Sequence, residues 1–254
     1  MKKIRTIGIV GGVGPYAGIV LNRMIFDESR ARCDRDFPEV HLISASGRIG
    51  DRTEFILSPR KKKNPAYAIV DIVENLAALG SDIIAIPCNT AHSPVIFDVV
   101  QREIKNRGIK VQLINMIDEV IKNLQDLKKK SHKKNLRTGL LATVGTNTSG
   151  VYRAAIEKND GMEFVSLPEE YINLVHETIY NPQYGLKATG VFVSDRAVKN
   201  ITAAVENLVL KGTDCVIFGC TELSMVLPRI SSRVEMIDSL RVLALTLLKR
   251  IKMM

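Results

Sequence analysis

The chain has no tryptophan, and aromatic residues make up only 5% of its 254 residues. Proteins that stack nucleic-acid bases place aromatic side chains among basic ones, but no aromatic residue interrupts the basic runs of this sequence. No stretch approaches the roughly 18 consecutive apolar residues of a transmembrane helix. These absences argue against nucleic-acid and membrane partners.

Cysteine is also scarce, and the four cysteines include no close Cys-x-x-Cys pair. The first residues lead directly into a strand-like run, without an apolar leader segment. We therefore expect a cytoplasmic protein with reduced thiols, rather than a disulfide framework or a zinc finger. Cys33 and Cys215 are interpreted as structural or incidental.

The overall composition is that of a soluble globular protein, with 46% apolar and 25% charged residues. The formal net charge is +9, and much of the excess lies in two runs at 60–63 and 128–134. We interpret both runs as solvated surface. A net positive field also favours the approach of a small anionic substrate to a cleft.

Two cysteines stand at corresponding points of two similar motifs. Cys88 comes after the apolar run Ile83–Ile86, and Cys220 comes after Val216–Phe218. Small polar residues and a helix-compatible segment follow each, which predicts a strand, a turn carrying the thiol, and a helix. Unpaired N–H groups and the helix dipole lower the pKa of a thiol at a helix N-terminus, so we expect two reactive thiols.

The similarity extends to a series of residues that recur 132 positions later in the chain. The first copy contains Val73, Glu74, Asn75, Leu76, Gly80, Asp82 and Cys88, and the second contains Val205, Glu206, Asn207, Leu208, Gly212, Asp214 and Cys220. Upstream, Arg5-Thr6 and Gly18 match Arg137-Thr138 and Gly150 at the same spacing. This pattern indicates a duplicated α/β unit.

Strand-like and helix-like segments alternate along the whole chain, which indicates parallel sheets covered by helices on both faces. We therefore predict an α/β fold of two similar Rossmann-like lobes, related by pseudo-twofold duplication, with the active site in the cleft between them. The first lobe is expected to comprise residues 1–115 and 226–254 and to carry Cys88. The second is expected to comprise residues 116–225 and to carry Cys220.

A glycine motif, Gly11–Pro15, formally matches a dinucleotide-binding fingerprint. That fingerprint needs an acidic residue at the end of the next strand, where this chain has Ser44-Ala45-Ser46, so NAD is not favoured. The loop that follows carries Arg48 and Arg52 at the sheet edge where α/β proteins bind ligands. Arg52 is therefore a candidate to clamp a carboxylate.

The spacing of the thiols permits three interpretations. A metal site would use Cys88, His92 and Cys220, but a packing or hydrogen-bonding role explains His92 more simply. A single nucleophilic cysteine with a histidine base leaves the duplicated thiol without a role. Two opposed acid/base groups use both thiols: one removes a proton from one face of a carbon and the other delivers a proton to the opposite face, which inverts the stereocentre.

Removal of a proton α to a carboxylate requires hydrogen-bond donors that stabilise the enolate-like charge. The side chains in position to provide them are Asn89, Thr90, Thr143 and Thr221, together with nearby backbone N–H groups. This chemistry requires no organic cofactor and no metal ion.

Five segments spread over essentially the whole chain form a distinctive set: Gly11-Gly12-Val13-Gly14-Pro15, Asp51-Arg52-Thr53, Pro87-Cys88-Asn89-Thr90-Ala91-His92, Gly185-Leu186-Lys187-Ala188 and Gly219-Cys220-Thr221-Glu222-Leu223. Together they resemble the aspartate/glutamate racemase family, in particular aspartate racemases that need no pyridoxal phosphate. The resemblance implies a two-lobed α/β enzyme that acts on an acidic amino acid and forms a homodimer.

The resemblance also implies roles for individual residues. Cys88 and Cys220 would be the two proton donor/acceptors, Asn89 and Thr90 would hold the α-carboxylate, and Arg52 and Lys187 would recognise the side-chain carboxylate. The remaining members of the expected substrate-binding set are Ala91, Thr143, Thr221 and Glu222.

Some details differ from the family pattern. Val13 stands where the family commonly has methionine, and the loop around Lys187 is longer than in compact relatives. One branch of the family replaces the first cysteine with threonine, whereas this chain keeps Cys88, which favours a symmetric two-base mechanism.

The sequence thus predicts a cofactor-independent aspartate racemase. The alternatives are a glutamate or broad-specificity amino-acid racemase, a cysteine-dependent isomerase or decarboxylase of small carboxylic acids, and a catalytically silent anion-binding or regulatory protein. Whether Arg48, Arg52 or Lys187 contacts the side-chain carboxylate stays open at this point.

Overall fold

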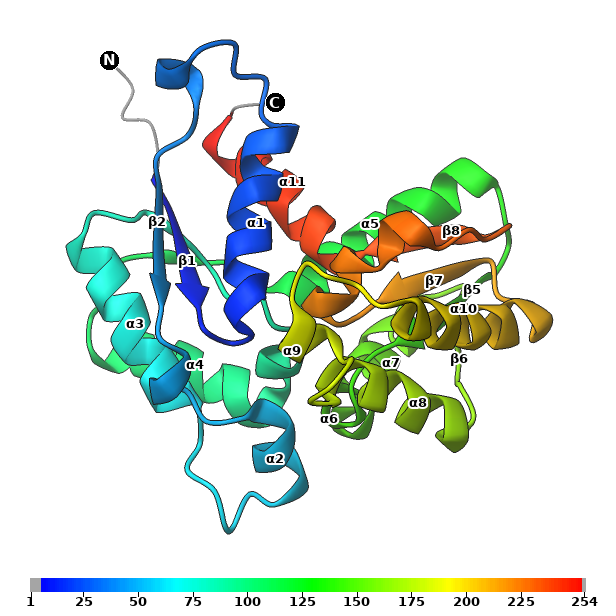
Figure 1. Ribbon diagram of the computed structural model, residues 1–254. Coiled ribbons are helices and arrows are strands. Elements are labelled where there is room, and N and C mark those ends of the chain that lie inside the picture. The colour runs from blue at the N-terminus through cyan, green and yellow to red at the C-terminus, as the bar shows by residue number, and fades with distance from the viewer. Residues whose placement is uncertain (1–5, 253–254) are drawn as a thin grey trace. The chain divides into compact units, whose positions relative to one another are not determined.

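The computed structural model describes residues 6–252, and its strands form two sheets of four parallel strands each (Figure 1). The first sheet has the order β2-β1-β3-β4 and contains β1 (Ile7–Gly11), β2 (Val40–Ser44), β3 (Ile83–Ala85) and β4 (Gln112–Leu113). The second has the order β6-β5-β7-β8 and contains β5 (Leu136–Leu141), β6 (Met162–Val165), β7 (Cys215–Phe218) and β8 (Glu235–Asp238). The predicted α/β fold with two parallel sheets is confirmed.

The chain divides into two compact units. One contains the residues up to Met116 together with the segment from Leu240, and the other comprises Ile117–Ser239. The expected boundary at residue 225 differs from this division, because β8 pairs with β7 and so belongs to the second sheet. The chain returns to the first unit in the last helix, α11 (Ser239–Ile251), at Leu240.

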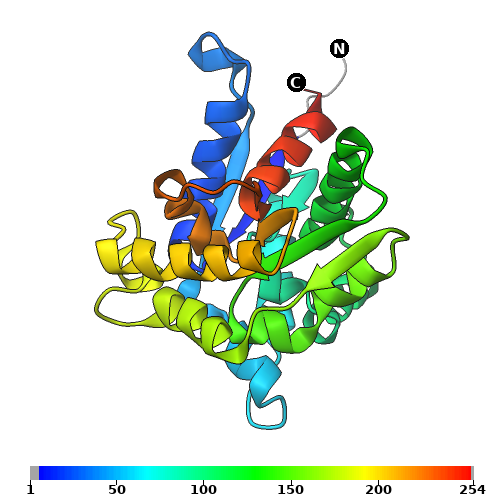
Figure 2. The same cartoon turned by 90° about the vertical axis from the view of Figure 1, so that its right-hand side faces the viewer.

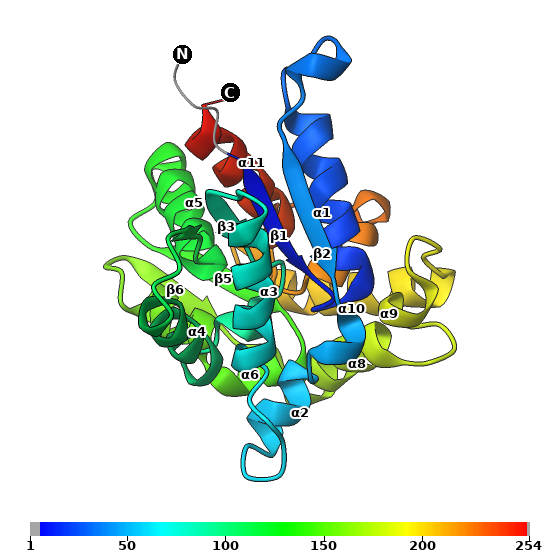
Figure 3. The ribbon, with the colours of Figure 1, turned by 90° about the vertical axis from the view of Figure 1, so that its left-hand side faces the viewer.

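Helices cover both faces of the first sheet (Figure 3). Helices α3 (Ala66–Ala78) and α4 (Pro94–Asn106) pack against the face that contains Ile84. Helices α1 (Pro15–Glu28) and α11 pack against the opposite face, which contains Ile83 and Ala85. Since successive residues of a strand point to opposite faces, an uninterrupted apolar run satisfies both cores.

In the second unit, α8 (Glu169–Tyr180) and α10 (Asp195–Leu210) lie side by side and pack against Val216 and Phe218 of β7 (Figure 2). The other helices of this part are α5 (Met116–Ser131), α6 (Val144–Ser149), α7 (Val151–Glu157) and α9 (Leu186–Thr189). Helices α6 and α7 are separate, because Gly150 adopts a left-handed φ of 65° between them.

No helix within residues 6–252 combines the length and the apolar composition needed to cross a membrane.

The repeat around the two cysteines has the same backbone hydrogen bonds in both units. The amide of Ser81 donates to the carbonyl oxygen of Leu76, and the amide of Thr213 donates to that of Leu208. These pairs stand 132 residues apart, as the sequence match predicts, and each closes the helix that precedes the cysteine strand.

The upstream matches at the same spacing are not structurally equivalent. Ile7 lies beside Ile83, whereas Thr138 lies beside Cys215, so the first strands of the two units correspond at a spacing of 131. The sequence match of Thr6 with Thr138 is therefore shifted by one residue from the structural match. Arg5, the other residue of the first copy, lies outside the described residues.

Candidate active site

Each candidate cysteine lies in a turn after the carboxyl end of an interior strand. Cys88 follows β3, Cys220 follows β7, and both side chains are buried. A short 3₁₀-helix comes next in each case, η3 (Asn89–His92) or η4 (Thr221–Met225). The helix that follows each thiol directly is thus only about one turn long, and so short a helix contributes little dipole at the cysteine.

The Cys220 thiol belongs to a charged network within the second unit. Its Sγ donates to Glu222 Oε2 at 3.1 Å, and the Thr221 hydroxyl donates to the same oxygen at 3.2 Å. Lys187 Nζ donates to the other oxygen, Oε1, at 2.8 Å and lies 5.1 Å from the centre of the Tyr180 ring. The side chain of Glu222 is 4% exposed and that of Lys187 is 20% exposed, so water screens this pair only weakly.

This environment raises the pKa of Cys220, so the expected lowering is wrong for this thiol. Burial is the main cause, the negative charge of Glu222 adds to it, and Lys187 opposes it. Burial alone would also raise the pKa of Glu222. The charge of Lys187 and the hydrogen bonds from Lys187 and Cys220 together outweigh burial and lower the pKa of Glu222 to about 2. The side chain of Cys220 is therefore a protonated thiol that donates its hydrogen to the ionised Glu222 carboxylate.

Lys187 reaches this network from α9, a helix of only four residues. Helix α9 packs against η4. The structure thus brings together Lys187, Thr221 and Glu222, all predicted to bind substrate, but it joins them to one another and to Cys220.

The first cysteine turn is built from uncharged groups. Asn89, Thr90 and Ala91 are buried in η3. His92 Nδ1 donates to the Cys88 carbonyl oxygen at 2.9 Å, and its ring stacks on Phe97 with the centroids 4.7 Å apart. Burial lowers the pKa of His92 to about 4, so the ring is neutral near pH 7. These contacts fit the packing and hydrogen-bonding role inferred for this histidine.

Arg52 is buried at the start of α2 (Arg52–Leu57), which packs against η3. Its Nη1 donates to the carbonyl oxygen of Gly50 at 3.1 Å, and its Nη2 donates to that of Val13. The guanidinium therefore ties the glycine motif to α2, in addition to any contact with a substrate.

Helix α2 itself falls in a stretch interpreted from the sequence as a loop. Asp51 Oδ1 accepts from the amide of Glu54 at 2.9 Å and so caps the helix. An aspartate followed three residues later by a glutamate is a sequence signal for a helix start, and it stands here beside glycines that favour a loop.

The backbone of the glycine motif, Gly11–Pro15, packs closely against the backbone that follows β2. Gly12 has a φ of 86°, and a Cβ there would lie 2.5 Å from the amide nitrogen of Ser46. Only glycine fits, and the close approach is to the end of β2 rather than to an open surface. Arg48, the other arginine in this part of the chain, is exposed at the end of the short helix η2 (Ser46–Arg48).

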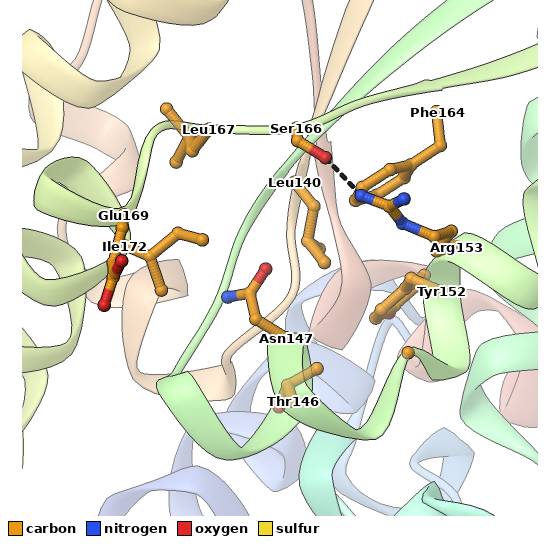
Figure 4. A pocket seen from close by; sticks show the side chains of 11 residues that line it. Leu140, Thr146, Asn147, Tyr152, Arg153, Phe164, Ser166, Leu167, Glu169 and Ile172 are labelled. Carbon is orange, nitrogen blue, oxygen red and sulfur yellow. Dashed lines mark hydrogen bonds between the residues drawn. The ribbon is translucent and has the colours of Figure 1, made fainter.

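Thr143 caps α6, because its Oγ1 accepts from the amide of Thr146 at 3.2 Å. Behind this turn lies a cavity of about 280 Å³ formed by β5, β6 and the helices α6 to α8, into which Asn147 projects (Figure 4). The side-chain nitrogen Nδ2 of Asn147 also donates hydrogen bonds to the carbonyl oxygens of Ala142 and Thr143. No predicted site residue lines this cavity.

Among residues 6–252, no three His, Cys, Asp or Glu side chains are grouped as a metal site would require. The candidate catalytic groups are therefore the two buried cysteines, one in each α/β unit, each placed after an interior strand.

The class of enzyme follows from comparison with known proteins. The chain belongs to the Asp/Glu/hydantoin racemase family, whose profile matches residues 10–247. It is an isomerase of the amino-acid racemase class, as the sequence resemblance predicted.

Individual relatives differ in the substrates that their names give. The structure of an aspartate racemase from Picrophilus torridus has a TM-score of 0.76 and 26% identity, with 98% of this chain and 94% of that chain covered. A broad-specificity amino-acid racemase of Bacillus subtilis is 26% identical over 248 residues, which is 94% of each protein. A glutamate racemase of Persephonella marina is 27% identical over 221 residues, covering 85% of this chain and 75% of the relative.

Proposed function

We propose that this racemase interconverts L- and D-aspartate by proton transfer at Cα, with Cys88 and Cys220 as the two acid/base groups. The observation that carries the proposal is the pair of buried thiols, each in the turn after an interior strand of its own parallel sheet. The duplicated backbone around them supports matching roles.

In one direction, the Cys88 thiolate would take the Cα proton and become a thiol, while the Cys220 thiol would give its proton to the opposite face and become a thiolate. The reverse reaction exchanges the two roles. The mechanism requires the two turns to face opposite sides of the substrate. Hydrogen bonds from Asn89, Thr90 and Thr143 would stabilise the charge that develops on the α-carboxylate. We propose no cofactor for this step.

Aspartate is favoured over other substrates by the name of the Picrophilus relative and by the five motifs that resemble aspartate racemases. One observation favours broader specificity as a second candidate. Lys187 already binds Glu222, and Arg52 already donates to two backbone carbonyls, so both cations assigned to the side-chain carboxylate have internal partners. The Bacillus relative is named as a broad-specificity racemase.

Proton NMR of the purified protein with L-aspartate in D₂O tests the proposal, with no pyridoxal phosphate or metal added. Loss of the α-proton signal together with formation of D-aspartate is the expected result. Exchange without inversion would contradict the two-base mechanism. If asparagine and alanine react as fast as aspartate, the broad-specificity function replaces the aspartate-specific one.

We also propose a cytoplasmic homodimer, in line with the family resemblance. Light scattering of the purified chain tests the assembly, and a monomeric mass at micromolar concentration would contradict it.

A further inference from the structure

A thiol that donates to a buried carboxylate is held in its protonated form. Glu222 Oε2 accepts hydrogen bonds from Cys220 and Thr221, and Oε1 accepts from Lys187, so an ionised carboxylate satisfies all three donors at once. Ionisation of Cys220 would place a second negative charge about 3.1 Å from the first, whereas Lys187 donates to the far oxygen, Oε1. The network therefore opposes formation of the Cys220 thiolate.

We propose that Glu222, fixed by Lys187, is a positioning residue that keeps Cys220 protonated and aligned as a proton donor in the free enzyme, so that the two thiols enter the reaction in unequal states. The role of Cys220 as the acid rests on the proposed function. The effect of Glu222 on the Cys220 thiol does not.

Other groups around this network do not replace Glu222. Tyr152 on α7 stays neutral, because burial raises its pKa. Asp238 on β8 accepts from the Ser224 hydroxyl at 2.6 Å, and the Tyr180 ring contacts the ammonium group of Lys187. Glu222 is the negative group that touches Cys220 Sγ directly.

The proposal has a defined kinetic consequence. Two enantiomers have equal free energy in water, so kcat/KM must be the same in both directions whatever Glu222 does. The reaction needs one thiol and one thiolate. Glu222 can instead set the pH range in which Cys88 and Cys220 together carry this single proton. Its removal should move the alkaline limb of the pH profile to lower pH, because Cys220 then loses its proton more easily.

The test measures the rate of alkylation of Cys220 by iodoacetamide as a function of pH, with the modified peptide quantified by mass spectrometry. In the wild-type protein, the midpoint for Cys220 should lie above that of the exposed Cys33, which is read from the same digest. In Glu222→Gln, the Cys220 midpoint should fall by at least one pH unit, which is about tenfold more thiolate below the midpoint. Glu235→Gln removes the same charge from an exposed position in the same unit and should leave the midpoint unchanged.

A Cys220 midpoint in the wild-type protein at or below that of Cys33 would overturn the proposal without any variant, so the test holds even if Glu222→Gln does not fold. An unchanged or higher midpoint in folded Glu222→Gln would also overturn it. The alkylation profile does not depend on racemisation. If the midpoints behave as expected but the NMR assay shows no exchange, the proposed function fails and the role of Glu222 stands.

Discussion

Two positions after the cysteine, the first turn has Thr90 and the second has Glu222; four positions after it, they have His92 and Ser224. His92 hydrogen-bonds back to the carbonyl of its own cysteine, whereas Ser224 donates to Asp238 of the neighbouring strand. The two turns share their backbone course, from the closing hydrogen bond of the preceding helix to the 3₁₀-helix after the thiol. The side chains that set the charge of each turn differ: the first turn has the neutral Thr90 where the second has Glu222.

A second pair of elements shows the same divergence. The short helices α2 and α9 pack against η3 and η4, and each carries a basic residue near its start. Arg52 on α2 donates to backbone carbonyls, whereas Lys187 on α9 pairs with a carboxylate. A duplicated scaffold can thus keep its two thiols in matching places and still surround them with different charges, so the sequence symmetry of the cysteines does not imply a symmetric resting enzyme.

Removing the thiols one at a time is the strongest test of the comparison between the two cysteine turns. Cys88→Ala and Cys220→Ala should each lower the rate of racemisation by about a thousandfold or more, because each removes one acid/base group. The assay is the appearance of D-aspartate from L-aspartate, with circular dichroism to confirm folding.

Cys33→Ser is the matched control, because Cys33 is exposed and should be dispensable. Racemisation within tenfold of the wild-type rate in either alanine variant would contradict the two-base mechanism, whichever turn is affected.

The next largest effect concerns the two basic residues. Lys187→Met should lower kcat/KM roughly 10- to 100-fold, the range expected for loss of a hydrogen bond to a buried charged group. Because we place Lys187 behind Glu222, the loss should be similar for aspartate and for its neutral analogue asparagine. The measurement is α-proton exchange of both amino acids in D₂O.

Arg52→Ala provides the comparison from the other turn. Its contacts to Val13 and Gly50 also predict equal losses for the two substrates, together with a lower free energy of unfolding. A loss confined to aspartate would show that the altered cation contacts the side-chain carboxylate, as the family resemblance implies.

The two units should also differ in their response to acid. The pKa of His92 is about 4 in the folded protein and about 6.5 in an unfolded chain, so the folded state binds fewer protons between these values. The free energy of unfolding should therefore fall by about 3 kcal/mol as the pH is lowered from 6.5 to about 4. The contribution of Glu222 in the second unit is lost only from about pH 4.5 down to about 2.

Hydrogen exchange followed by mass spectrometry at pH 7 and pH 5, corrected for intrinsic rates, should therefore show a loss of protection in β3 before β7. His92→Gln should abolish the difference in pH dependence. An equal loss in both strands of the wild-type protein would contradict the assignment to His92.

The strands were predictable because their local signal is strong. A buried parallel strand is an unbroken apolar run, and Ile83–Ile86 cannot place its side chains in water without a large cost. Helix starts also carry a local signal, since Pro94 is the first residue of α4 and Asp51 caps α2. Such features depend on residues a few positions apart.

The charged network around Cys220 was not predictable in this way. It depends on Lys187, which is 35 positions from Glu222 in the sequence and reaches it only through the packing of α9 on η4. The register of the repeat likewise depends on which residue of β5 lies beside Cys215, a tertiary fact that a sequence match cannot supply. The substrate-binding roles of Asn89 and Thr90 stay predictions.

The smallest effect tests the backbone that the two turns share. Gly80 and Gly212 end the helices before the cysteine strands with left-handed φ values of 95° and 75°. Alanine at either position should lower the free energy of unfolding by roughly 1 kcal/mol, measured by urea denaturation. A Cβ at Gly80 meets no atom within 4 Å, whereas one at Gly212 lies 2.7 Å from Nη1 of Arg137. Arg137 Nη1 donates to the carbonyl oxygen of Gly212, so Gly212→Ala should cost a few tenths of a kcal/mol more. The reverse order would show that Arg137 does not stabilise this turn.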